Sequence, residues 1–296
     1  MFLQKVIGTA FSRAGDGLVK LDLTNEESVN ELFKTKFDAI IHCAAERRPD
    51  VAAKNVEASK KLNESVPRLL AEISKQHGIF LIYISTDYVF DGKKPPYNPG
   101  DIPNPVNQYG KFILRVSKYN GEKCIESSGL ENYVILRVPI LYGKIAYLGE
   151  GAVDVLLKHL MSSIEDKKNG IAVEKTAVDN EQARFPTNTQ DVARVLCEIT
   201  EKRLIQKDNQ IFGIAHFSAQ DQYTKFEMCN VFAKCLKIDQ EEYFEPLDPT
   251  TVTAAVDRPE NSHLSNSVLE KWGIDTSFVS FDSWWENAIS KSCFLV

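Results

Sequence analysis

The sequence of 296 residues has no long hydrophobic run, no excess of positive charge and no paired cysteine motif. Its longest apolar stretches, such as Ile79–Ile84, are far shorter than the ~18 residues that a membrane-spanning helix needs. The net charge of −6 argues against a duplex nucleic-acid binder, which needs a basic face. These absences leave an ordinary globular protein, with 43% hydrophobic and 26% charged residues, as the expected class.

Metal-binding and export signals are also missing. The six cysteines and five histidines show no spacing typical of a metal site, and the cysteines lie mostly in apolar segments, which indicates reduced thiols in a cytosolic protein. The opening Met1–Ala10 contains Gln4 and Lys5, so its apolar stretch is too short for a signal peptide. We therefore expect a cytoplasmic protein without a metal ion.

What the first half does contain is a regular alternation of apolar, β-branched segments with helical patterns. The expected strands are Lys5–Phe11, Leu18–Leu23, Asp38–Ala45, Ile79–Thr86 and Tyr133–Val138. The expected helices between them are Asn25–Lys34, Ala52–Gln76 and Tyr109–Ser127. This alternation predicts right-handed crossovers and a parallel, doubly wound α/β sheet.

Local signals refine these elements. Thr24, followed three residues later by Glu27, is typical of a capping box at a helix start. Pro67 should kink or interrupt its helix. Asp38–Ala45 is apolar for most of its length and is expected to be fully buried, with His42 as a hydrogen-bonded core imidazole.

The second half is more mixed. Helical patterns cover Gly151–Ser163, Asp191–Lys202 and Lys225–Leu236, and Gly213–Phe217 resembles a strand. No internal repeat or low-complexity linker separates the halves, so we expect a smaller α+β lobe that grows out of the first.

Several blocks resemble known families. The blocks similar to extended short-chain reductases, and most closely to the dTDP-4-dehydrorhamnose reductase branch, are FLIYISTDYVFDG (Phe80–Gly92), NQYGK (Asn107–Lys111) and LRVPILYG (Leu136–Gly143). The blocks similar to one group in that branch, the regulatory β subunits of methionine adenosyltransferase, include IIHCAAERRPD (Ile40–Asp50) and RFPTNTQDVA (Arg184–Ala193). The resemblance extends over nearly the whole chain.

The resemblance implies a Rossmann-like nucleotide-binding domain at residues 1–145 and 185–217, and a smaller lobe at 146–184 and 218–296. Members of the family open with a strand and a glycine-rich loop whose N–H groups hold the cofactor pyrophosphate. This sequence contains no Gly-x-x-Gly-x-x-Gly, and Met1 falls just before the family's second strand. Because the missing strand belongs in the middle of the sheet, we expect a gap there.

The resemblance also implies a vestigial catalytic set. The family places a Ser or Thr at a strand end, and a Tyr and a Lys at i and i+4 on one helix face. Thr86 and Tyr109 match, but Ile113 occupies the i+4 position. Deleting Phe112–Val116 would restore the spacing with Lys118. The five residues therefore resemble an insertion, which must loop out if Lys118 is to serve.

The positions that the resemblance assigns to NADP, besides Tyr109 and Lys118, are Phe11, Ser12, Arg13, Asp22, Leu23, Cys43, Arg47 and Leu141. An arginine such as Arg13 accommodates the 2′-phosphate of NADP, and Arg47 is expected near the cofactor phosphates. Simpler alternatives remain open: solvated arginines, caps at Asp22 and Thr86, a core thiol at Cys43 and a core leucine at Leu141. Without the glycine-rich loop, we expect NADP binding to be weak or lost.

The C-terminal segment Ser277–Val296 is rich in aromatic residues, which are Phe278, Phe281, Trp284, Trp285 and Phe294. One interpretation is a helix that packs its aromatic face on the chain's own second lobe. The other is a tail that inserts into a partner, as the resemblance implies.

Two functional hypotheses follow. The first is a non-catalytic regulatory subunit that binds the catalytic subunit of methionine adenosyltransferase in a hetero-oligomer and modulates S-adenosylmethionine biosynthesis. The second is an NADP-dependent reductase of the dTDP-4-dehydrorhamnose type. The blocks at Ile40–Asp50 and Arg184–Ala193 favour the first, and the disrupted Tyr/Lys pair weighs against the second.

Overall fold

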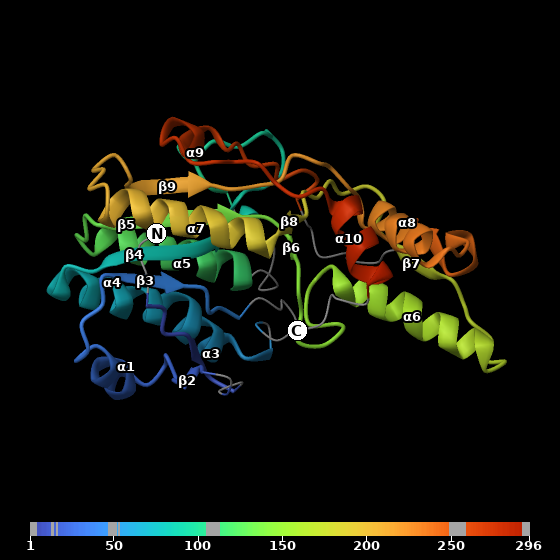
Figure 1. The fold of residues 1–296 in the computed structure, drawn as a ribbon, viewed down its shortest axis with the longest axis horizontal. Helices are drawn as coiled ribbons and strands as arrows, with labels where there is room; N and C mark the ends of the chain where they lie inside the picture. Colours follow the sequence, from blue (N-terminus) through green and yellow to red (C-terminus); the bar gives the residue numbers. More distant parts are fainter. Residues whose placement is uncertain are drawn as a thin grey trace. The chain divides into compact units, whose positions relative to one another are not determined.

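The computed structural model describes residues 5–12, 15, 17–46, 52, 54–104, 113–248 and 259–291. The chain divides into two compact units, and each is described by itself (Figure 1). Unit 1 consists of Met1–Tyr83 and Tyr109–Val134, and unit 2 consists of Ile84–Gln108 and Ile135–Val296. The lobe boundaries expected from the sequence remain a prediction.

A four-stranded sheet has the order β3-β4-β5-β9. Its strands are β3 (Ala39–His42), β4 (Phe80–Thr86), β5 (Tyr133–Val138) and β9 (Gly213–His216). β3 and β4 run parallel, with Ala39 opposite Phe80 and His42 opposite Tyr83. β4 and β5 are almost entirely buried, as expected for apolar strands of a sheet that is covered on both faces. The predicted α/β fold with a parallel sheet is confirmed.

The sheet is interrupted in unit 1. β1 (Thr9–Ala10) and β2 (Val19–Lys20) pair with each other in a separate parallel sheet, so both strands are shorter than predicted. Among the described residues, no strand pairs with the outer edge of β3. The expected gap is therefore present. The predicted full burial of Asp38–Ala45 is wrong, because β3 has a neighbour on one side only and Ile41 is 44% exposed.

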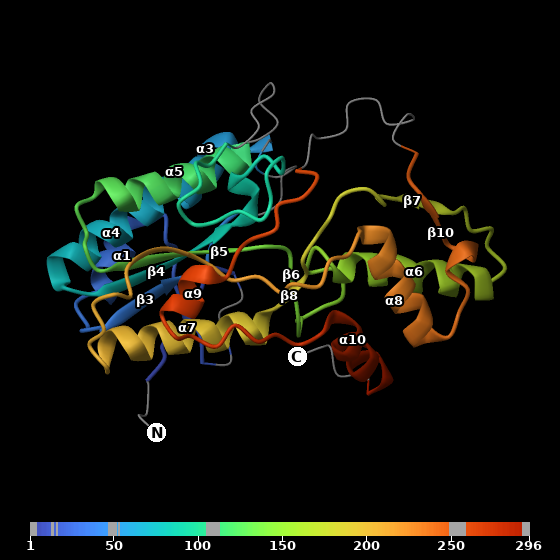
Figure 2. The same cartoon turned by 90° about the horizontal axis from the view of Figure 1, so that it is seen from above.

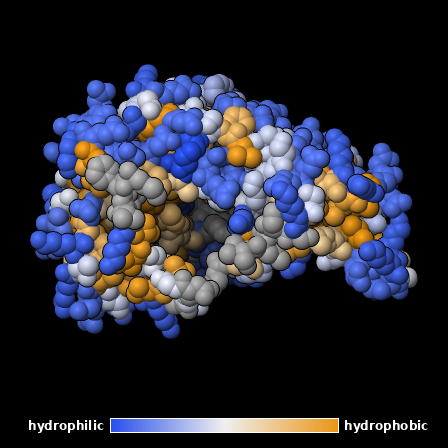
Figure 3. Space-filling model, in the orientation of Figure 1, coloured by the Kyte–Doolittle hydropathy of each residue, from blue (hydrophilic) through white to orange (hydrophobic). Residues whose placement is uncertain are grey.

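Apolar side chains are exposed around this interruption. Figure 3 shows hydrophobic residues gathered over the part of unit 1 that contains β2 and β3. The large exposed hydrophobic residues of this part of the chain are Val6, Ile7, Phe11, Leu18, Val19 and Ile41. An apolar surface of this kind is what a sheet leaves exposed when a neighbouring element is missing.

The first helix of unit 1, α1, spans Glu26–Leu32 and begins one residue later than the predicted capping box requires. The Asn25 side chain, rather than Thr24, accepts a hydrogen bond from the Ser28 N–H at 3.0 Å. The Thr24 hydroxyl instead donates to Asp22 at 2.7 Å. The predicted cap at Thr24 was therefore wrong. Thr24 and Asn25 are both residues that can cap a helix, and the hydrogen bond from Thr24 to Asp22 leaves Asn25 as the cap.

The long helix of unit 1 contains a π turn. It consists of α3 (Val56–Lys60), the π turn η1 (Lys61–Ser65) and α4 (Val66–His77). The predicted interruption lies in the turn before Pro67, which itself belongs to the first turn of α4. Since proline has no N–H to donate to the carbonyl four residues earlier, the altered hydrogen bonding of a π turn fits this position. The helix α5 (Ile113–Ser127) packs against η1 and α4.

Unit 2 contains two short parallel strand pairs and most of the remaining helices. The pairs are β6 (Leu141–Tyr142) with β8 (Thr187–Asn188), and β7 (Thr176–Val178) with β10 (Phe244–Pro246). The helices are α6 (Asp154–Lys168), α7 (Thr189–Leu204), α8 (Lys225–Leu236), α9 (Ser267–Lys271) and α10 (Phe281–Ser290), with short 3₁₀ turns at η2 (Asp87–Val89) and η3 (Gln240–Glu242).

The aromatic face of α10 packs on α8 within unit 2 (Figure 2). The Trp285 ring centroid lies 4.9 Å from that of Phe232, and Phe281 lies 5.0 Å from Tyr142. Both Phe281 and Trp285 are fully buried. The packing interpretation of the aromatic segment is confirmed for α10, whereas Phe294 lies outside the described residues.

Candidate functional site

The side chain at the centre of the candidate site is a buried lysine. Lys118 lies on α5 and is only 6% exposed. Its ammonium nitrogen is 3.9 Å from the ring centroid of Tyr83 on β4, a cation–π arrangement. Burial lowers the pKa of Lys118 to about 7, although the nearby Glu122 and Cys43 act in the opposite direction. A buried amine that is half neutral near physiological pH is typical of functional sites.

Cys43 and His42 belong to the same part of unit 1. Cys43 is exposed as a residue, but desolvation of its thiol raises the pKa, with Lys118 opposing the shift. A raised pKa disfavours the thiolate, so Cys43 is not an activated nucleophile.

His42 is buried and neutral but is not fully hydrogen bonded. Its ring stacks on Tyr83 with 5.6 Å between centroids, and burial together with Lys118 lowers its pKa to about 3. The Nε2 atom has no hydrogen-bond partner among the described residues. The prediction of a satisfied core imidazole is therefore correct for burial and wrong for hydrogen bonding at Nε2.

Asn63 organises this site and was not predicted from the sequence. It is fully buried in the π turn η1. Its side-chain amide donates to the Ser117 hydroxyl at 3.0 Å and to the Glu46 carbonyl at 3.2 Å, and its oxygen accepts the Glu46 N–H at 3.0 Å. Asn63 thus ties the segment after β3 to the turn of α5 that bears Lys118. The only signal in the sequence is a polar amide within a helical pattern.

The close approach of α5 depends on Gly121. A Cβ atom at this position would lie 2.6 Å from the Tyr83 hydroxyl and closer still to the Asn63 carbonyl. Any side chain here would push α5 away from the π turn and from β4. Gly121 therefore sets how deeply Lys118 is buried.

The apparent insertion does not loop out where the structure describes it. α5 begins at Ile113, so four of the five residues Phe112–Val116 belong to the start of this helix. For these four residues, the structure does not show the looped-out arrangement that would be required for Lys118 to serve beside Tyr109. Tyr109 lies outside the described residues, so its relation to Lys118 remains a prediction.

Thr86 in unit 2 acts as a cap. Its hydroxyl accepts the Tyr88 N–H at 3.2 Å and donates to Asp87 at 3.0 Å, which starts the η2 turn. The buried Asp87 also accepts a 2.5 Å hydrogen bond from the Ser262 hydroxyl. These contacts match the strand-end alternative for Thr86, and its catalytic role remains a prediction.

The other assigned cofactor positions differ in exposure. Phe11 is 66% exposed after β1 and Ser12 is also exposed. Asp22 accepts two hydrogen bonds from Thr24, which lower its pKa. Leu23 and Leu141 are half-buried. Arg13 and Arg47 lie outside the described residues, so their roles remain predictions.

Lys118, which the family resemblance assigns to the cofactor ribose, is buried against Tyr83, with its pKa lowered. No group of three or more His, Cys, Asp or Glu side chains in the described part of the chain is arranged to hold a metal ion. Among the same residues, no helix is long and apolar enough to cross a membrane.

Comparison with known proteins defines the class. A family model described as RmlD substrate binding domain matches residues 4–291. The structure of dTDP-4-dehydrorhamnose reductase from Bacillus anthracis in complex with NADP is 27% identical, covers 92% of this chain and 85% of its own, and has a TM-score of 0.72. The chain therefore has the Rossmann-type fold of RmlD-like proteins.

Relatives with higher sequence identity identify a narrower family within this class. Methionine adenosyltransferase 2 subunit beta from Danio rerio is 38% identical over 287 residues, which is 97% of this chain and 81% of the relative. The Rattus norvegicus protein of the same name is also 38% identical and covers 90% of this chain and 75% of its own. The chain belongs to the family of methionine adenosyltransferase 2 β subunits, as the sequence blocks predicted.

Proposed function

We propose that this protein is a non-catalytic regulatory subunit that binds the catalytic subunit of methionine adenosyltransferase and modulates S-adenosylmethionine synthesis. The observation that carries the proposal is the match to relatives named as β subunits over 97% of the chain at 38% identity. Because a shared fold alone does not fix activity, the second support comes from the site. Lys118 is buried under Tyr83 rather than presented to a substrate.

Co-purification with the catalytic subunit tests this function. We expect the full chain to form a hetero-oligomer with it and to change the rate of S-adenosylmethionine formation. Removing Ser290–Val296 should weaken the association by about tenfold or more, since each buried Phe, Leu or Val side chain contributes roughly 1.5–3 kcal/mol before ordering costs. Surface plasmon resonance on both chains measures the difference.

The control for this truncation is a check of folding by circular dichroism and thermal unfolding. A folded, truncated chain that binds as tightly as the full chain would contradict the role of the tail. Failure of the full chain to bind the catalytic subunit would contradict the regulatory function itself.

The same proposal predicts weak or no binding of NADP(H) by the 296-residue chain. Arg13, Arg47 and Tyr109 remain in the sequence, but the pyrophosphate-binding loop does not. Calorimetric titration should therefore give no dissociation constant below about 1 μM, the affinity that corresponds to ~8 kcal/mol. A tighter constant, together with reduction of dTDP-4-dehydrorhamnose, would favour the reductase alternative.

A further inference from the structure

Two identical dipeptides of the sequence, Asn120–Gly121 and Asn169–Gly170, lie in very different surroundings. An asparagine followed by glycine is especially prone to spontaneous loss of its side-chain amide. The reason is that glycine has no side chain to hinder its main-chain nitrogen, and it allows the main-chain rotation that the reaction needs. Asparagine is accordingly one of the thermolabile residue types. The fold decides which of the two pairs reacts.

Asn169 and Gly170 form the exposed end of α6. Asn169 is the C-cap residue of this helix, Gly170 has a φ of 75°, and both residues are exposed. The next residue, Ile171, is 55% exposed, and residues 171–175 belong to no helix or strand. A Cβ atom built on Gly170 would meet nothing within 4 Å. The main chain of this pair therefore has open space in which to rotate.

The hydrogen bonds that hold this pair belong to the last turn of α6. The Gly170 N–H donates to the Lys167 carbonyl at 3.1 Å. The Asn169 side-chain amide donates to the Glu165 carboxylate over a long 3.4 Å. All four residues are exposed. Because the free energy of opening falls toward zero at fraying ends of helices, the Gly170 nitrogen is released from its carbonyl at little cost.

The Asn120–Gly121 pair lies in the interior of α5 instead. The Asn120 side-chain amide donates to the Glu64 carboxylate at 3.1 Å, and Gly121 is buried against Asn63 and Tyr83. Rotation of the main chain here requires that α5 opens and leaves its contacts with η1. Such opening in a packed helix costs a free energy closer to that of global unfolding.

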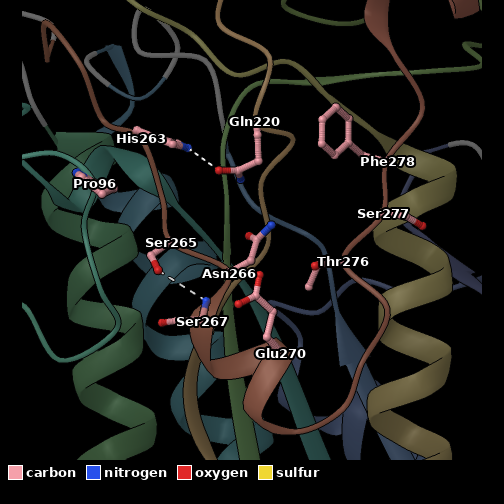
Figure 4. Close-up of a pocket in the computed structure, with 10 residues that line it drawn as sticks. All are labelled: Pro96, Gln220, His263, Ser265, Asn266, Ser267, Glu270, Thr276, Ser277 and Phe278. Carbon is pink, nitrogen blue, oxygen red and sulfur yellow. Dashed lines mark hydrogen bonds between the residues drawn. The ribbon is translucent and has the colours of Figure 1, made fainter.

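A third asparagine that precedes a small residue, Asn266, is protected as well. It is 7% exposed, and its side chain donates to the Ser218 carbonyl and accepts the Ser218 N–H, both at 2.9 Å. Figure 4 shows the Ser267 main-chain nitrogen, the atom that would attack, in a hydrogen bond with the Ser265 hydroxyl. Of the three pairs, Asn169–Gly170 alone has both residues exposed.

We propose that Asn169 is a site of spontaneous deamidation, which produces aspartate and isoaspartate at the end of α6. The Gly170 main-chain nitrogen attacks Cγ of Asn169, and the new N–C bond closes a cyclic imide. The Cγ–Nδ2 bond breaks, and ammonia leaves with the proton that the Gly170 nitrogen loses. Water then opens either C–N bond of the imide, so the net reaction consumes water and releases ammonia. It needs no oxidant or cofactor and is independent of the proposed regulatory function.

The product changes the end of α6 in two ways. It places a negative charge at a helix C-terminus, where the helix dipole disfavours an anion. Isoaspartate also lengthens the main chain by a methylene group. The Gly170 and Ile171 N–H groups, which donate to Lys167 at 3.1 Å and to Asp166 at 2.9 Å, then lose their alignment with these carbonyls. We therefore expect the last turn of α6 to lose protection from hydrogen exchange.

Peptide mapping by mass spectrometry tests the site in the full chain, aged in mildly alkaline buffer at physiological temperature. Peptides that contain Asn169 or Asn120 are compared with those of the fresh chain, and isoaspartate is detected by methylation with protein-isoaspartate methyltransferase. In the folded chain we expect Asn169 to be lost at least about tenfold faster than Asn120, since about 1.4 kcal/mol of additional opening free energy corresponds to tenfold. In the urea-unfolded chain, the two rates should become similar.

Asn169→Gln is the matched variant, because it keeps an amide at the exposed cap but its longer side chain closes a cyclic imide far more slowly. This variant should form no product at the cap and should leave the slow loss at Asn120 unchanged. Equal rates at Asn169 and Asn120 in the folded chain overturn the proposal. So does an Asn169 that stays intact in the folded chain while the urea-unfolded chain reacts. Unchanged hydrogen exchange over residues 165–171 of the deamidated chain would overturn the inferred change in α6.

Discussion

Replacing Lys118 by methionine is expected to stabilise the protein strongly at neutral and acidic pH. Burial lowers the pKa of Lys118 from 10.5 to about 7. The folded state therefore binds a proton at this side chain less tightly than the unfolded state does. Below pH 7 this difference destabilises the wild-type fold by up to about 5 kcal/mol. As pH rises from 7 to 10.5, the unfolded chain also loses the proton and the cost disappears.

Urea unfolding of both proteins between pH 6 and pH 10.5 measures this effect. The Lys118→Met variant should be more stable by several kcal/mol at pH 6.5, and the two curves should converge near pH 10.5. Lys123→Met on the same helix is the control, because the Lys123 side chain is 55% exposed. Parallel pH curves for the wild type and Lys118→Met would show that Lys118 is not buried as the structure describes.

Removing the Trp285 side chain should destabilise unit 2 by about 3–5 kcal/mol, the usual cost of truncating a buried tryptophan. The ring is fully buried and has Phe232, Phe281 and Trp284 within 6.2 Å between centroids. The neighbouring side chains are held in place by α8 and α10 and cannot close the resulting cavity. The free energy of unfolding therefore falls by the lost transfer free energy of the side chain and also by the cost of the cavity.

Trp284→Ala is the comparison, since Trp284 lies on the same helix and is only half-buried. Thermal unfolding should show a clearly smaller loss for Trp284→Ala than for Trp285→Ala. Equal losses would mean that α10 does not present Trp285 to the core. The order of the two effects therefore tests the register of α10.

Elements whose sequence pattern matched a buried environment were predicted well. Tyr133–Val138 and Lys225–Leu236 have the predicted bounds, and β4 begins one residue after the predicted Ile79. The strands at Lys5–Phe11 and Leu18–Leu23 were predicted too long. Their apolar pattern is genuine, but a strand extends only as far as a neighbour offers hydrogen bonds.

The candidate site could be predicted from the sequence only in part, for a different reason. The resemblance identified Lys118 as a position of interest, but its burial depends on contacts made across the fold by Tyr83, Asn63 and Gly121. None of these contacts follows from local spacing. The π turn at η1 illustrates the reason, since Pro67 indicates an interruption and only the packing of α5 decides which hydrogen bonds change.

The hydrogen bond between Asp87 and Ser262 has a consequence for the order in which the protein folds. The two residues are 175 positions apart, and the neighbouring Tyr97 N–H donates to the His263 carbonyl at 2.8 Å. Both contacts belong to unit 2. During synthesis, which proceeds at ~5–20 residues per second, the segment after β4 must wait for about nine seconds or longer before its partner emerges from the ribosome. Contacts of such long sequence separation also slow folding, so unit 2 reaches its native state only after almost the whole chain has been made.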